Sequence, residues 1–135
     1  MKLILSLAII LCVFKSHGQV NGGDSIKNHS PVIDTTVYTK VEILASFGGG
    51  DYAWKRFLSK YMYSPNADEV KKIVVVRFVV DEEGKTSDIN IISAPDDKAY
   101  REETIRVIKK SSGYWMAAVD HGKHVRSYKT VSIEY

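Results

Sequence analysis

The strongest constraint on the fold is a pair of alternating segments joined by a short polar turn. The first, Ile73–Val80, is apolar at every even position, namely Val74, Val76, Phe78 and Val80. A polar stretch, 81–85, carries a glycine at its fourth position, and Thr86–Ser93 then alternates again. A period of two is typical of a strand with one buried face, and a short loop with glycine between two such runs favours a hairpin. We therefore predict a β-hairpin over residues 73–93.

Two segments with helical spacing flank this hairpin. After the glycines at 48–50, one helix face collects Ala53, Trp54, Phe57, Leu58 and Tyr61. A second helix is predicted to run to about Ser112, with Asp96 or Asp97 as its N-cap. Its apolar face collects Tyr100, Thr104, Val107 and Ile108. On its exposed side, Glu102 and Arg106 are spaced for an i, i+4 ion pair.

Two further strands complete the pattern. Val37–Ile43 alternates, and Val125–Tyr135 is rich in β-formers up to the end of the sequence. The order strand, helix, strand, strand, helix, strand is typical of an α+β fold, here a small antiparallel sheet with two helices packed on one face. The predicted core contains Trp54, Phe57, Val76, Phe78 and Trp115.

The first residues have the organisation of a targeting segment. Lys2 precedes an apolar run, Leu3–Phe14, and Ser16-His17-Gly18 has small residues at its first and third positions. This pattern predicts a signal peptide over residues 1–18. The run is shorter than the roughly 20 apolar residues of a spanning helix. The length therefore favours a signal peptide, and a membrane anchor is the alternative. Residues 19–36 are expected to form a flexible linker before a domain over residues 37–135.

Composition excludes several classes of function. The net charge is +3, and it falls to +1 without Lys2 and Lys15, so no nucleic-acid partner is expected. Cys12 is the only cysteine and lies in the predicted signal peptide. Removal of that segment would leave no disulfide and no cysteine nucleophile.

The sequence offers no recognisable catalytic constellation. The glycines at 48–50 precede a helix but lack the Lys-Ser/Thr pair of a phosphate loop. His121 and His124 are three residues apart without a third ligand at a familiar spacing. The acidic residues around the predicted hairpin loop lack the order of a calcium loop. A sharp turn, exposed loop histidines and a solvated hairpin are the favoured interpretations, so we predict no enzyme activity, no cofactor and no metal.

Taken in order, these segments resemble the C-terminal domain of TonB-type energy transducers. The motifs that carry the resemblance are Phe47 with Gly49-Gly50 and Ala53, Phe57 and Leu58; the hairpin with Asp81 and Gly84; Glu103, Ile105–Ile108 and Trp115; and Gly122–Arg126. The resemblance covers Val37–Tyr135. The sequence departs from the family pattern where Gly48 and Ala117 replace prolines, and where Ser64 separates Tyr63 from Pro65.

The resemblance implies both a site and a partner. In the family, the last strand lies at a sheet edge and pairs with a short segment of an outer-membrane TonB-dependent receptor, and the Tyr-Pro region contacts receptors. The residues that it implies for partner binding are Tyr63, Pro65, Val125, Arg126, Tyr128, Lys129 and Val131.

Two functions are compatible with this resemblance. The first is a periplasmic interaction module of TonB-dependent transport, and the second is a structural or regulatory periplasmic domain that uses the same edge for self-association, as a homodimer, or for an unrelated partner. The series of motifs favours the first. The absence of a predicted spanning helix and of a Pro-rich spacer favours the second. An uncleaved first segment would instead anchor the chain in the inner membrane.

Overall fold

The computed structural model describes residues 34–66 and 70–135. The predicted signal peptide, and the predicted linker up to residue 33, lie outside the described residues. Within the described ranges, neither helix has the length and apolarity needed to cross a bilayer.

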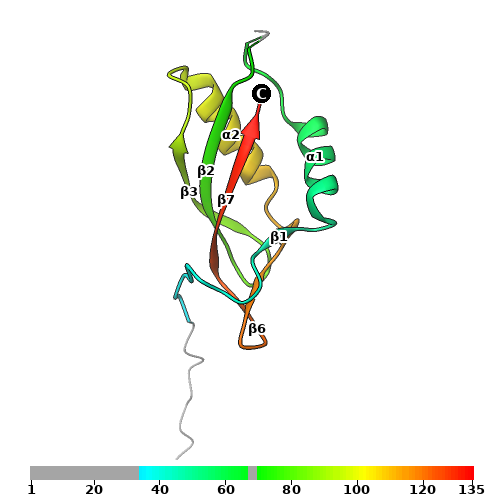
Figure 1. The fold of residues 1–135 in the computed structure, drawn as a ribbon, viewed down its shortest axis with the longest axis vertical. Coiled ribbons are helices and arrows are strands. Elements are labelled where there is room, and N and C mark those ends of the chain that lie inside the picture. Colours follow the sequence, from blue (N-terminus) through cyan, green and yellow to red (C-terminus); the bar gives the residue numbers. More distant parts are fainter. Residues whose placement is uncertain (1–33, 67–69) are drawn as a thin grey trace, which may run out of the picture. The chain divides into compact units, whose positions relative to one another are not determined.

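A three-stranded antiparallel sheet forms the centre of the domain (Figure 1). Its strand order is β3-β2-β7, with β2 at Ile73–Val80, β3 at Thr86–Ser93 and β7 at Ser127–Glu134. The hairpin is therefore confirmed with the predicted bounds. Strand β2 pairs with β7 along its whole length, from Ile73 opposite Glu134 to Val80 opposite Ser127.

The hairpin loop is built around one aspartate and one glycine. Asp81 Oδ1 accepts the N–H groups of Glu83 and Lys85 at 3.0 and 2.8 Å. Gly84 has a φ of 78°, and a Cβ at this position would lie 2.0 Å from the carbonyl oxygen of Trp115. Only glycine combines positive φ with such a close backbone approach, which explains the D-x-x-G pattern of the loop.

Both predicted helices are present. Helix α1 spans Gly50–Tyr61 and follows Gly49, whose φ is 86°. Helix α2 spans Lys98–Lys110, and its N-cap Asp97 accepts the N–H of Ala99 at 2.9 Å. Helix α2 lies across the back of the sheet, whereas α1 lies beside β7 (Figure 1). The α+β class is confirmed.

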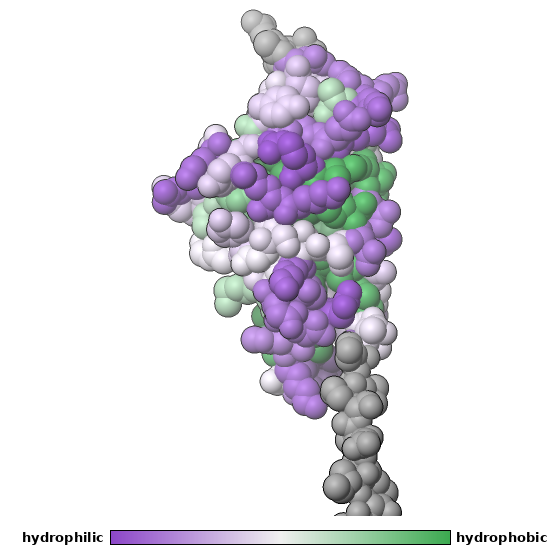
Figure 2. Space-filling model, turned by 180° about the vertical axis from the view of Figure 1, so that it is seen from behind, coloured by the Kyte–Doolittle hydropathy of each residue, from purple (hydrophilic) through white to green (hydrophobic). Residues whose placement is uncertain are grey.

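The core lies between β2 and the helices. All four even positions of β2 are fully buried, as are Val107 and Ile108 on α2. Phe47, Phe57 and Trp115 join them, and Trp54 packs against this cluster while partly exposed. The predicted core residues are therefore confirmed, with Trp54 at its boundary. The back of the molecule is mostly hydrophilic, with a hydrophobic strip at one side (Figure 2).

Four short strands pair in two small ladders. Strand β1, Ser46–Phe47, pairs with β4, Trp115–Met116, and β5, Ala118–Asp120, pairs with β6, Lys123–Val125. The β5–β6 hairpin lies at the end of the domain that is opposite the C-terminus (Figure 1).

Two predicted strands need correction. The predicted strand Val37–Ile43 is wrong, because only two isolated bridges occur there, Tyr38 with Ser127 and Ile43 with Val119. These partners belong to different ladders, so the segment bends between them. The predicted final strand Val125–Tyr135 is interrupted at Arg126, since Val125 ends the β5–β6 hairpin and β7 begins at Ser127.

The predicted Glu102–Arg106 pair is also wrong. Glu102 pairs with Lys98 on the surface, at 3.1 Å. Arg106 donates instead to Glu103, from Nε at 2.7 Å and from Nη2 at 2.6 Å, and Glu103 is only 1% exposed. Because a buried carboxylate needs partners, Arg106 pairs with Glu103 rather than with Glu102, although the Arg106 side chain itself stays 45% exposed.

Candidate partner-binding site

One edge of strand β7 pairs with no other strand within residues 34–66 and 70–135. Its other edge pairs with β2, and the Tyr128 N–H points away from β2, because it donates to the carbonyl of Tyr38 at 3.1 Å. Main-chain groups alternate in direction along a strand. The N–H and C=O groups of Thr130, Ser132 and Glu134 therefore also point away from β2. Among the described residues, no strand pairs with this part of β7. Unpaired N–H and C=O groups of this kind form a template for another strand.

Tyr38 already occupies the first position of this edge. Its N–H donates to the carbonyl of Arg126 at 2.8 Å, and its carbonyl accepts from Tyr128. The bridge that these bonds form with Ser127 is parallel. The open part of the edge therefore begins at the carbonyl of Tyr128 and continues to Glu134.

A groove accompanies the open edge. A cavity of about 220 Å³ lies between β7 and the start of α1, and Trp54 and Val131 are among its lining residues. A second cavity, of about 450 Å³, continues between the later part of α1 and the end of β7, where Trp54, Leu58 and Met62 face Ser132 and Glu134. Trp54 and Ser132 border both cavities. The groove follows the edge because α1 runs alongside β7 (Figure 1).

The seven residues implied for partner binding fall into three places. Lys129 and Val131 line the groove. Val125 and Arg126 line a different cavity, of about 430 Å³, with Tyr38. Tyr128 lies between these two places, on the sheet face opposite the helices, with the Arg77 guanidinium 4.9 Å from its ring centroid.

Tyr63 and Pro65 follow the end of α1, in a segment whose backbone is hydrogen-bonded to side chains of α2. The Tyr63 N–H donates to Glu103 Oε1 at 3.1 Å, and Arg106 Nη2 donates to the carbonyl of Tyr61 at 2.5 Å. The Arg106 guanidinium also lies 5.7 Å from the centroid of the Tyr63 ring, which is 59% exposed. The Glu103–Arg106 pair thus fixes the backbone of this segment and leaves the Tyr63 ring accessible.

Sequence reasoning missed several residues of the groove. Thr130, Ser132 and Glu134 supply its main-chain groups, and Leu58 and Met62 supply its apolar wall. The alternation within the last strand was a usable signal for the first three. No signal in the sequence places α1 beside β7, because that contact joins segments about 70 residues apart.

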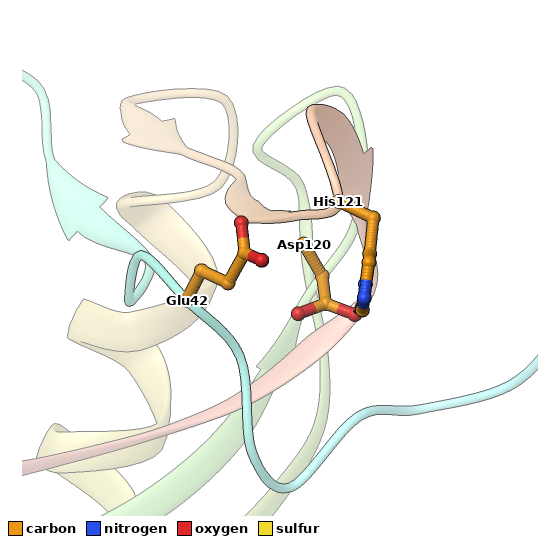
Figure 3. A group of neighbouring side chains, drawn as sticks. All are labelled: Glu42, Asp120 and His121. Carbon is orange, nitrogen blue, oxygen red and sulfur yellow. Dashed lines mark hydrogen bonds and ion pairs between the residues drawn. The ribbon is translucent and has the colours of Figure 1, made fainter.

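One cluster of titratable side chains lies away from the groove. Glu42, Asp120 and His121 have their ligand-type atoms within 4.8 Å of one another (Figure 3). The Ile43–Val119 bridge brings Glu42 beside Asp120, and His121 Nδ1 lies 2.9 Å from Asp120 Oδ2. The sequence suggested His124 as the neighbour to consider for His121, whereas the structure groups His121 with two carboxylates.

We expect the replacement Asp120→Asn to lower the pKa of His121. The hydrogen bond to Asp120 and its charge, and then the charge of Glu42, raise this pKa above its ordinary value of 6.5. A pKa that is higher in the folded than in the unfolded state stabilises the fold at pH values below the unfolded-state pKa. This contribution is lost as the pH rises through the folded-state pKa. Imidazole titration by NMR measures the shift. Glu42→Gln is the control with a smaller decrease, and an unchanged His121 pKa in Asp120→Asn would refute the pairing.

Comparison with known proteins identifies the family. The family model "Gram-negative bacterial TonB protein C-terminal" matches residues 62–135, more than half of the chain. The match contains all seven residues implied for partner binding, but not the Phe47 to Leu58 motif. No curated protein and no solved structure matches the chain. TonB C-terminal domains are periplasmic protein-interaction domains of Gram-negative bacteria. The chain therefore belongs to the TonB C-terminal family and has a TonB-related role in transport energy transduction.

Proposed function

We propose that this protein is a periplasmic interaction module that binds an extended segment of an outer-membrane TonB-dependent receptor along the free edge of β7. The observation that carries the proposal is the outward-facing main chain at Thr130, Ser132 and Glu134. In β-augmentation, such groups bond to an added strand and supply affinity, while side chains supply selectivity. The family of the chain supports a receptor as the partner.

Side chains around this edge would then select the segment. Lys129 and Val131 border the groove, and Tyr128 lies on the opposite sheet face. Arg126 and Val125 lie beyond the Tyr38 bridge, where they would contact residues that extend past the paired strand. Tyr63 and Pro65 form a second contact in the proposal, with the exposed Tyr63 ring offered to the receptor.

We further propose that residues 1–18 are removed on export and that residues 19–36 link the new N-terminus to the domain over residues 37–135. Fractionation and intact-mass measurement of the natively expressed protein test this step. A soluble periplasmic chain that begins near Gln19 is expected. A membrane-bound chain that retains Met1 would show instead that the apolar run is an inner-membrane anchor.

The replacement Ser132→Pro tests the use of the edge. Proline removes one N–H that points away from β2, and its ring obstructs an added strand, while the β2–β7 bonds are kept. We expect at least roughly tenfold weaker binding, because one hydrogen bond of about 1 kcal/mol and the close approach are both lost. Calorimetry with synthetic peptides that cover the periplasmic N-terminal segments of the host's outer-membrane receptors provides the measurement.

The matched control is Ser132→Ala, which keeps the main-chain N–H and should bind as the wild type does. Circular dichroism of both variants checks that the sheet is intact. Wild-type affinity in a folded Ser132→Pro variant would contradict pairing at this edge.

The same edge supports self-association as the second candidate function. A second copy of the chain could add its own β7, since the open main chain is not specific for one partner. Sedimentation velocity distinguishes the two functions. A dimer that Ser132→Pro dissociates, together with no affinity for any receptor peptide, would favour the structural or regulatory role.

A further inference from the structure

We propose that Glu42, Asp120 and His121 bind a divalent transition-metal ion, and zinc is the ion to test first. Glu42 lies in the segment before β1, and Asp120 and His121 lie in the β5–β6 hairpin. None of the three lines the groove beside β7. The inference therefore goes beyond the proposed function and does not depend on receptor binding.

The three side chains present metal-donor atoms at a suitable separation. One carboxylate oxygen of Glu42, one of Asp120 and an imidazole nitrogen of His121 all lie within 4.8 Å of one another. Donors at about 2.0–2.1 Å from a tetrahedral zinc ion are about 3.3 Å apart. The Asp120 carboxylate lies between the other two side chains (Figure 3). Glu42 and His121 are exposed, so small rotations of their side chains would bring all three donors onto one ion.

Main-chain pairing holds the backbone beneath these side chains. Ile43 and Val119 exchange two hydrogen bonds, at 3.0 and 2.9 Å, in an antiparallel bridge. Glu42 therefore lies opposite Asp120, and opposite side chains on antiparallel strands share one face. Asp120 ends β5, and His121 follows it in the hairpin loop. The fold thus brings the donors together before any metal binds, as a preorganised site requires.

The donor set indicates the class of ion. An imidazole nitrogen with carboxylate oxygens suits zinc and other first-row transition metals, whereas magnesium and calcium prefer oxygen donors alone and more of them. Asp120 and His121 also border a cavity of about 430 Å³, which gives an ion access from solvent and leaves room for a water molecule as a further ligand.

The surrounding charge sets the expected strength. The two carboxylates match the charge of a divalent ion, but Lys123 lies opposite Asp120 in the β5–β6 ladder and borders the same cavity. Its positive charge opposes a bound cation. With three protein donors and this lysine, we expect a dissociation constant on the order of micromolar rather than nanomolar.

A bound ion would cross-link two segments that are distant in the sequence. Glu42 belongs to the segment that also carries Tyr38, whose bridge to Ser127 occupies the first position of the β7 edge. Metal binding would therefore hold this segment against the β5–β6 hairpin. Because the site exists only in the folded chain, excess zinc should raise the thermal midpoint by about 5 °C.

Zinc titration of the full chain, without an affinity tag, tests the proposal. In ¹⁵N-labelled protein, zinc should perturb the NMR signals of Glu42, Asp120 and His121, and calorimetry gives the affinity. His121→Asn should weaken binding at least roughly tenfold, because even the supporting partners of metal ligands contribute that much. Asparagine tolerates the φ of 49° at this position, so the hairpin should be retained. Glu42→Gln, which removes a charged donor at nearly unchanged size, should weaken binding similarly.

Two matched controls make the same chemical changes elsewhere. His124→Asn alters the other histidine of the hairpin, and Glu102→Gln alters an exposed carboxylate on α2. Both variants should keep the wild-type affinity for zinc. Magnesium at about 1 mM should not displace zinc from the wild-type chain.

Three results would overturn the proposal. Equal zinc affinity of the wild type and a folded His121→Asn variant would mean that the ion is bound elsewhere in the chain. Unperturbed NMR signals of Glu42, Asp120 and His121 would mean the same. Displacement by magnesium would contradict a transition-metal site. Each result leaves peptide binding along β7 unaffected, so a failure here is distinct from a failure of the proposed function.

Discussion

Replacement of Trp115 by alanine is expected to lower the free energy of unfolding by about 4 kcal/mol, the typical cost of removing a large buried aromatic side chain. Trp115 is 5% exposed, and its ring centroid lies 5.1–5.4 Å from those of Phe47, Trp54 and Phe78. Its Nε1 donates to Ser111 Oγ at 2.9 Å. Alanine would leave a cavity in the core and remove one hydrogen bond from the Ser111 hydroxyl, which keeps its bond to the Ile108 carbonyl at 2.7 Å.

Urea denaturation followed by circular dichroism measures this loss. The control is Met116→Ala at the neighbouring position, because Met116 is 61% exposed and should change stability by less than about 0.5 kcal/mol. A loss below about 1 kcal/mol for Trp115→Ala would mean that the aromatic cluster does not hold α1 against the sheet. Since Trp54 belongs to this cluster, the groove beside β7 should also lose its affinity for peptides in Trp115→Ala.

Replacement of Arg106 by methionine is expected to cost about 2 kcal/mol. The variant keeps the aliphatic stem but removes two hydrogen bonds from Glu103, which stays buried. The Arg106 side chain is 45% exposed whereas Glu103 is buried, so the replacement leaves the buried carboxylate with the Tyr63 N–H as its donor and without its ionic partner. It also removes the bond to the Tyr61 carbonyl, so the segment that leads to Tyr63 should lose its fixed position.

The Lys98–Glu102 pair provides the control, because it is exposed and similarly spaced along α2. Glu102→Gln should cost less than about 0.5 kcal/mol. The double variant Glu103→Gln with Arg106→Met should cost less than the sum of the single variants, since it leaves no unpaired charge. Strict additivity in urea denaturation would contradict energetic coupling between Arg106 and the buried Glu103.

The central hairpin was predictable because its determinants are local. The alternation of Ile73–Val80 and the turn around Asp81 and Gly84 specify strand, loop and strand without distant partners, and the observed bounds agree. The helices were predictable for a similar reason, from apolar spacing and the Asp97 cap. The family also followed from the sequence, since the order of its motifs survives without coordinates.

The tertiary structure decided the features that join distant segments. Val37–Ile43 alternates like a strand, but Tyr38 and Ile43 bond to different ladders, and so the segment bends. Arg106 pairs with Glu103 rather than with Glu102 because the packed fold buries the Glu103 carboxylate. Spacing along the helix does not show which of the two carboxylates is buried. By itself, the sequence determined the central hairpin, the two helices, the core face and the family of this protein. The open edge of β7, its closure at Tyr38 and the groove beside α1 depend on contacts across the fold, which local periodicity does not encode.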